Sequence, residues 1–145
     1  QLYRIIPRTI IRLKKGEKIQ LHGGGKAVKS YIHIRDVCEG IYFALRDGIN
    51  GTVYHLSTPE GISVRELVKK TCQLMGAPFE NVTEDVPDRP GHDFRYALDS
   101  SKARKLGIRP RHSFEEALKE TVSWYRSHSD WWQPLRKDKF TLKGL

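Results

Sequence analysis

Hydrophobic residues recur at helical spacing near the start of this 145-residue chain. The first group would share one helix face and consists of Ile5, Ile6, Ile10 and Leu13. Gly16 follows a basic turn, which is a common way for a helix to end. The pattern therefore predicts a first helix that stops at Gly16.

A different pattern follows, in which short runs of β-forming residues flank a cluster of glycines. Residues 18–21 and 29–34 have the composition of two short strands, and Gly23, Gly24 and Gly25 lie between them. Glycines can bring backbone amides close to a phosphate, but neither a dinucleotide fingerprint nor a Gly-Lys-Ser/Thr ending is present. We therefore expect a plain hairpin turn between the two strands.

Further helices are predicted downstream. One ends before Gly48 and has the apolar stripe Val37, Ile41, Ala44 and Leu45. Residues 52–56 then favour a strand.

Two capping boxes mark later helix starts, at Ser63 with Glu66 and at Ser113 with Glu116. The first helix of this pair ends at Gly76, and its expected core face is Val64, Leu67, Val68, Thr71, Cys72 and Met75. The second has an apolar side made of Phe114, Leu118, Val122 and Tyr125.

Between these helices, residues 96–98 suit a brief strand, and residues 100–106 suit a short helix stopped by Gly107. The chain thus reads as an α/β fold in which helices alternate with short strands. We expect one domain over residues 1–130 and a C-terminal tail over residues 131–145.

The C-terminal region carries two features outside this pattern. Trp131 and Trp132 could stack nucleic-acid bases, but aromatic residues at a helix end more often cover the edge of a core, and we expect that role. The densest basic cluster, residues 136–139, reads as a solvated tail.

Composition narrows the class of protein. No apolar run approaches the ~20 residues that a membrane-spanning helix needs, and no signal segment is visible. The chain lacks an initiator Met and enters an apolar pattern almost at once, so we expect a fragment of a longer, cytoplasmic protein. The net charge of +9 favours an anionic partner, which could be nucleic acid, an acidic membrane surface or a phosphorylated metabolite.

Cys38 and Cys72 are isolated in sequence and fall in helical patterns, so we expect two buried, reduced thiols. The histidines show no ligand spacing on one helix face, and no metal site is expected; they are His22, His33, His55, His92, His112 and His128.

Residues 88–96 carry the most specific candidate chemistry. Arg89 and Arg95 flank Pro90, Gly91 and His92. A guanidinium offers a planar fork of donors that matches phosphate oxygens, while a Pro-Gly pair lets the chain bend around them. The alternative is a solvated basic loop in which the arginines pair with the acidic residues Asp85, Asp88 and Asp93.

Taken together, these segments resemble the C-terminal part of the extended short-chain dehydrogenase/reductase family. The resemblance is to its sugar-nucleotide dehydratases and epimerases, such as dTDP-glucose 4,6-dehydratases. It covers nearly the whole chain and rests on residues 4–7, 16–25, 31–37, 53–57, 88–96, 99–102, 124–125 and 131–132. Each motif is weak alone, but their order and spacing together are specific.

The resemblance implies a substrate-holding role. Arg4, Ile5, Ile6 and Pro7 match a segment that lines the nucleotide site. Gln20, Leu21 and His22 match a strand that contacts the base. Arg89, Pro90, Gly91 and His92 match a loop that grips the diphosphate.

Three positions depart from the family pattern. Lys29 stands where the family usually has Arg, His55 where it often has Asn, and His22 where a Tyr is common. Lys29 and His55 are kept as candidate substrate-binding residues. The departures leave the base and the sugar open.

The resemblance also implies what the chain lacks. The family binds NAD or NADP in an N-terminal Rossmann domain and catalyses with a Tyr-x-x-x-Lys pair, and no tyrosine here has a lysine four residues later. We expect no catalytic residue, no cofactor bound to this chain alone, and an inactive chain in isolation.

The expected partner is a nucleotide-diphospho-sugar, in an NAD-dependent lyase or epimerase of polysaccharide biosynthesis, with no membrane contact. The alternative is a non-enzymatic basic module that binds nucleic acid, although that partner is less expected. A homodimer is possible, because a chain that lacks its Rossmann half would expose apolar surface.

Overall fold

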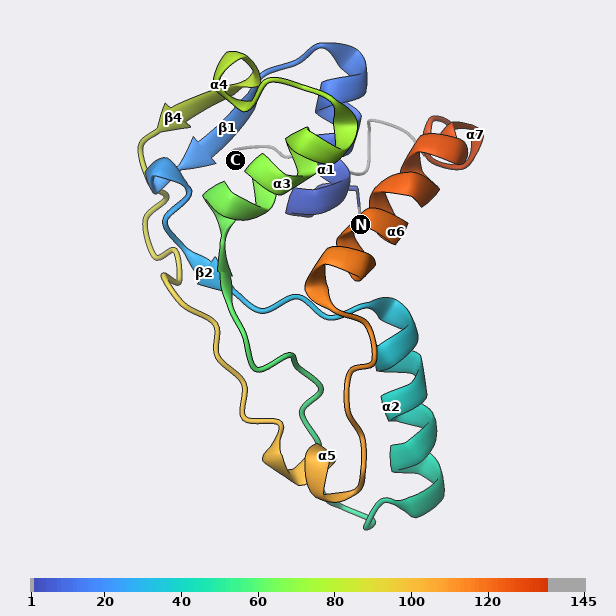
Figure 1. Cartoon of the computed structure of the whole chain (residues 1–145). Coiled ribbons are helices and arrows are strands. Elements are labelled where there is room, and N and C mark those ends of the chain that lie inside the picture. The colour runs from blue at the N-terminus through green and yellow to red at the C-terminus, as the bar shows by residue number, and fades with distance from the viewer. Residues whose placement is uncertain (1, 136–145) are drawn as a thin grey trace.

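A computed structural model describes residues 2–135 of the chain, as a mixture of helices and short strands (Figure 1). In chain order the elements are α1 (Ile5–Lys15), β1 (Ile19–His22), the 3-10 turn η1 (Gly23–Gly25), β2 (Val28–Lys29), α2 (Ile34–Asp47), β3 (Ile62–Ser63), α3 (Val64–Met75), α4 (Phe79–Val82), β4 (Thr83–Val86), α5 (Ser101–Lys105), α6 (Phe114–Ser127) and α7 (Ser129–Trp132).

Helix α3 lies at the centre of the core because it buries residues on two sides. Leu67 packs with Ile10 of α1 and with α6, while Val68 and Cys72 pack against β1. All of these side chains but those of α6 are fully buried. Burial of such side chains is worth about 1.5–3 kcal/mol each, so α3 holds α1, α6 and β1 in fixed positions.

Strand β1 does not form the predicted hairpin. It pairs in parallel with β4, with Ile19 opposite Thr83 and His22 opposite Val86, whereas β2 pairs antiparallel with β3. The hairpin prediction was wrong because β1 buries Ile19 and Leu21 against α3, which turns the strand away from β2. The composition that predicted β1 as a strand carries no information on its partner.

The three glycines between β1 and β2 form η1 and have positive φ angles. A Cβ on Gly23 would lie 2.7 Å from the Asp88 carboxylate, and one on Gly25 would lie 2.9 Å from the Arg65 backbone. The glycines are therefore needed because η1 packs closely against the loop that follows β4 and against the start of α3.

The helix ends follow the sequence closely. Helices α1 and α3 end in left-handed glycines at Gly16 and Gly76, as predicted. Ser113 and Glu116 form both bonds of a capping box at α6. At α3, the Ser63 hydroxyl accepts a hydrogen bond from the Glu66 amide, which is one of the two bonds of a box.

Two predicted strands differ from the structure. Residues 52–56 form no strand, and the strand predicted over 29–34 stops at Lys29 because its partner β3 has only two residues, Ile62 and Ser63. Near residues 96–98 only one bridge forms, between Arg95 and Val28. β-forming composition alone does not make a strand when no neighbouring backbone is available.

Helix α2 lies away from α3, beside α5 in the lower part of Figure 1. Its predicted apolar stripe is largely uncovered, with Ile41 and Leu45 50% and 82% exposed. The buried carboxylate of Asp36 joins its first turn to residues 111–112 by accepting bonds from both amides and from His112. Burial alone would raise the pKa of Asp36, but these hydrogen bonds outweigh it and hold the pKa below its usual value.

The two cysteines differ in exposure. Cys72 is fully buried, as predicted, and burial raises the pKa of its thiol to about 11. Cys38 is exposed, so the prediction of a buried thiol there was wrong, because it lies on the side of α2 that also exposes Ile41 and Leu45.

Near the C-terminus, Trp132 is buried at the core edge, whereas Trp131 is 52% exposed. The predicted domain boundary after residue 130 falls inside α7 and stays a prediction. Residues 136–139 lie outside the described residues. No helix in residues 2–135 is long and apolar enough to cross a membrane.

Replacement of Ser113 by Ala should lower the free energy of unfolding by about 1 kcal/mol, because the Glu116 amide loses the Ser113 hydroxyl that accepts its hydrogen bond. Thermal unfolding followed by circular dichroism measures this. Ser123→Ala, in the exposed interior of the same helix, is the matched control and should be neutral or slightly stabilising. Equal losses in the two variants would contradict the capping role.

The difference between the cysteines predicts selective alkylation. Iodoacetamide should modify Cys38 in the native chain and Cys72 only after unfolding, since burial keeps the Cys72 thiol protonated and out of reach. Peptide mass spectrometry identifies the modified residue. Comparable native rates for both thiols would be inconsistent with this packing.

Candidate functional site

Four cationic side chains from three segments lie close enough to influence one another electrostatically, and we name them the cationic cluster: Arg4, Arg8, Lys29 and Arg89. Arg4 and Arg8 lie one turn apart at the start of α1, Lys29 ends β2, and Arg89 lies on the loop after β4. The clustering shows in the charges themselves. Arg89 lowers the pKa of both Arg8 and Lys29, and Arg4 also lowers that of Lys29.

Two of these arginines each bury one guanidinium nitrogen without a partner. Nε of Arg8 and Nε of Arg89 are both inaccessible to solvent and have no hydrogen-bond acceptor in the structure. The pKa of Arg8 is lowered first by burial and then by Arg12 and Arg89. Buried donors of like charge are costly to leave unpaired, so this arrangement favours an anion.

The pKa of Lys29 is also lowered by its surroundings. Burial contributes most to lowering its pKa, Arg89 adds to the effect, and Asp93 opposes it. Its Nζ lies 4.6 Å from the centre of the Tyr96 ring, whose hydroxyl donates to Asp93 at 2.6 Å. The lysine is thus held beside the loop at residues 93–96 rather than extended into solvent.

The loop at residues 88–92 is held by Asp88. Its carboxylate accepts bonds from the Arg89 amide at 2.9 Å and from His92 Nδ1 at 3.0 Å. Gly91 has a φ of +69°, which suits the bend. Asp88 therefore occupies one nitrogen of His92, whereas no carboxylate pairs with the Arg89 side chain among the described contacts.

The other predicted residues surround the cluster in different ways. Ile5, Ile6 and Pro7 form the first turn of α1, which has no acidic residue and no side-chain cap. A helix N-terminus of this kind carries a partial positive charge. On β1, Gln20 is half-buried and Leu21 is fully buried in the core with Val68 and Cys72, so the Leu21 side chain packs the fold and is not open to a ligand.

His22 ends β1 next to the loop. Its Nδ1 lies 3.3 Å from the Pro87 carbonyl oxygen, and its Nε2 is buried without a hydrogen-bond partner. The structure therefore brings His22 toward the same loop that carries Arg89.

His55 lies elsewhere. It is exposed and lines a small hollow with Ser57, Ser100 and Arg104, and no residue of the cationic cluster contributes to that hollow. The structure does not bring His55 together with the loop that carries Arg89.

Sequence reasoning missed Arg8 and Tyr31. Arg8 follows Arg4 by four residues on a helix, a spacing that could have identified it. The Tyr31 hydroxyl is buried without a partner, and burial raises its pKa to about 12. No local pattern marks a single buried tyrosine.

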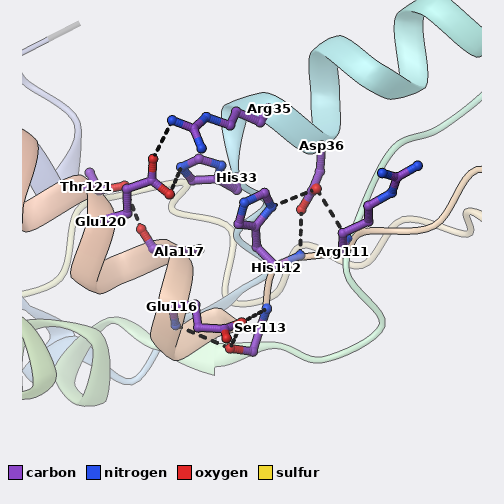
Figure 2. A network of polar contacts seen from close by, with 10 residues as sticks. All are labelled: His33, Arg35, Asp36, Arg111, His112, Ser113, Glu116, Ala117, Glu120 and Thr121. Carbon is purple, nitrogen blue, oxygen red and sulfur yellow. Dashed lines mark hydrogen bonds and ion pairs between the residues drawn. The ribbon is translucent and has the colours of Figure 1, made fainter.

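A second polar group lies where α2, α6 and the 111–113 segment meet (Figure 2). Arg35 contacts Glu120 at 2.8 Å, His33 lies 3.9 Å from the same carboxylate, and the His33 and His112 rings are 4.5 Å apart. Asp36 holds His112 from the other side at 2.9 Å.

Comparison with known proteins agrees with the family resemblance. A family model described as GDP-mannose 4,6 dehydratase matches residues 2–121. The chain belongs to this family.

Several members are clearly similar to the chain. A dTDP-glucose 4,6-dehydratase of Streptomyces niveus is 38% identical over 92% of this chain and 40% of that protein. The crystal structure of the dTDP-glucose 4,6-dehydratase DesIV from Streptomyces venezuelae, with NAD bound, has a TM-score of 0.87 at 37% identity, over 94% of this chain and 42% of that one. A UDP-glucose 4-epimerase from Thermotoga maritima, with UDP-glucose, has a TM-score of 0.78 at 30% identity, over 86% and 40%.

The family assignment confirms the expected fold, an extended short-chain dehydrogenase/reductase-like part made of helices and short strands. The chain spans about 40% of the length of the dTDP-glucose 4,6-dehydratases that it matches.

The family's NAD site does not fit the residues of this chain. The triple glycine of this chain lies between β1 and β2 rather than between a strand and a helix, and it packs against Asp88 and Arg65. These glycines are therefore not arranged to hold the pyrophosphate of NAD.

Replacement of Arg8 by Met should raise the melting temperature of the chain without ligand. The methionine keeps the packing of the side chain but removes a buried, unpaired donor and its repulsion from Arg12 and Arg89. A relief of ~1 kcal/mol corresponds to about 2–4 °C in a domain of this size. Arg109→Met, at an exposed position, is the matched control and should change little; a lower melting temperature for Arg8→Met would contradict this account.

Proposed function

We propose that residues 1–130 hold the nucleotide-diphosphate part of the substrate in an NAD(P)-dependent sugar-nucleotide 4,6-dehydratase or epimerase. The observation that supports this most is the pair of buried, unpaired guanidinium donors on Arg8 and Arg89. Two adjacent phosphates would supply the acceptors and the negative charge that these groups lack.

The cationic cluster suits a diphosphate better than a single anionic group. Arg89 and Arg8 would each contact a phosphate through a planar fork of donors, while Lys29 would act as a point charge between them. The uncapped first turn of α1 adds backbone amides and a favourable dipole. His92, held by Asp88 through Nδ1, would donate from Nε2 in its protonated form.

The nucleoside would lie next to the same elements. Ile5, Ile6 and Pro7 offer an apolar wall at the start of α1, and His22 offers a ring nitrogen that has no partner. Gln20 and Leu21 precede His22 on β1 and set its position. His55, which lines the separate hollow, would contact the sugar only if the substrate reaches across the chain.

In this proposal the chain binds and orients, and it has no catalytic residue of its own. The hydride chemistry, which the family performs with NAD or NADP, falls to a part of the whole enzyme outside this chain. The chain alone should be inactive. The exposed apolar side of α2, with Ile41 and Leu45, is then a surface for further protein, either the rest of the enzyme or a second copy in a homodimer.

Calorimetric titration of the chain with dTDP-glucose and UDP-glucose tests the proposal. Arg89→Ala should weaken binding at least tenfold, because a hydrogen bond to a charged group is worth about 1.5–3 kcal/mol. Arg109→Ala removes an exposed arginine outside the cluster and should leave the affinity unchanged. Unchanged affinity in Arg89→Ala would contradict the role of this loop.

The alternative is binding of nucleic acid by a basic surface, which the net charge of +9 and the exposed Trp131 would support. Retention of RNA or DNA on filters that falls steeply with salt, without affinity for nucleotide sugars, would favour it over our proposal.

A further inference from the structure

The polar group in Figure 2 contains three side chains of the kind that bind transition metals. We propose that His33, His112 and Glu120 form a binding site for a divalent transition-metal ion, best matched by zinc. One potential ligand atom from each residue lies within 4.8 Å of the other two. This site is separate from the cationic cluster and independent of the proposed substrate.

The geometry is close to that of a metal shell. Zinc lies about 2.0–2.2 Å from nitrogen and oxygen ligands, so neighbouring ligands in a tetrahedron are roughly 3.3–3.5 Å apart. Nε2 of His33 and Oε2 of Glu120 are 3.9 Å apart, and the two imidazole rings are 4.5 Å apart at an angle of 41°. Small side-chain rotations would bring all three ligand atoms to one ion.

His33 is the strongest sign of an absent partner. Its side chain is only 8% exposed, its Nδ1 is buried with no hydrogen bond, and its Nε2 is too far from Glu120 for one. Nε2 therefore has no hydrogen bond to Glu120 and is the atom that an ion placed between the two residues would bind.

The other two ligands are already oriented by neighbours. Asp36 accepts a hydrogen bond from His112 Nδ1, which leaves Nε2 of His112 with the lone pair that a metal requires. Arg35 holds Oε1 of Glu120 at 2.8 Å, which leaves Oε2 on the side of His33. Metal-binding histidines and carboxylates are commonly held by such outer contacts.

The donor set points to the class of metal. Two imidazoles and one carboxylate match zinc, whereas magnesium and calcium prefer shells made of oxygen. Three protein ligands leave the fourth position for water. The positive charge of Arg35 would oppose the ion, but this side chain is 70% exposed and solvent screens it.

Such an ion would add a further link between two regions that Asp36 and the Arg35–Glu120 ion pair already connect. His33 precedes α2, His112 precedes α6, and Glu120 lies inside α6. Because the ligands come from distant parts of the chain, the ion would bind the folded state and stabilise it by mass action.

The test uses the full chain after treatment with a chelator. Titration with Zn²⁺ should show one ion bound per chain and a rise in melting temperature, while Mg²⁺ at the same concentration should give no rise. Titration with Co²⁺ should produce visible absorption bands of a four-coordinate ion. Absence of zinc binding by the wild-type chain would overturn the proposal.

Two glutamates on α6 provide a matched pair of variants. Glu120→Gln should weaken zinc binding at least tenfold, and His33→Gln should do the same. Glu115→Gln, which changes an exposed carboxylate that pairs with Lys70, should bind zinc like the wild type. Equal affinity in Glu120→Gln and Glu115→Gln would refute the site, and circular dichroism verifies that both variants are folded.

Discussion

The burial of α3 on two sides is the constraint from which the rest of the arrangement follows. Leu67 on one side fixes α1 and α6, and Val68 with Cys72 on the other fixes β1. Since β1 in turn pairs with β4, the loop after β4 is brought beside the start of α1. The cationic cluster exists only because these apolar contacts overcome the repulsion between its members.

The cationic cluster and the polar group in Figure 2 both contain buried groups without partners, which lowers the stability of the fold. In the cluster these are guanidinium nitrogens of Arg8 and Arg89, and in the second centre it is the imidazole of His33. Buried polar groups in folded proteins usually have a partner, so each of these is a place where a bound species could supply one. One centre would take an anion and the other a cation, so the two would not compete.

Local features of the fold were predictable from the sequence, and pairing was not. Gly16, Gly76 and Ser113 set helix ends through contacts within a few residues, and the structure has them as expected. The partner of β1 depends on which face α3 covers, which no local pattern contains.

The candidate sites divide in the same way. Arg89 stood out because its loop has a distinctive composition, whereas Arg8 and the approach of His33 to His112 arise from packing between distant segments.

The parallel pairing of β1 with β4 also affects the order of folding. It brings His22 next to the Pro87 carbonyl, and these residues are 65 positions apart in the sequence. All of α2 and α3 lies within that span, and closing so long a stretch of chain has an entropic cost. The cationic cluster should therefore be among the last parts to assemble during refolding, after the local helices have formed.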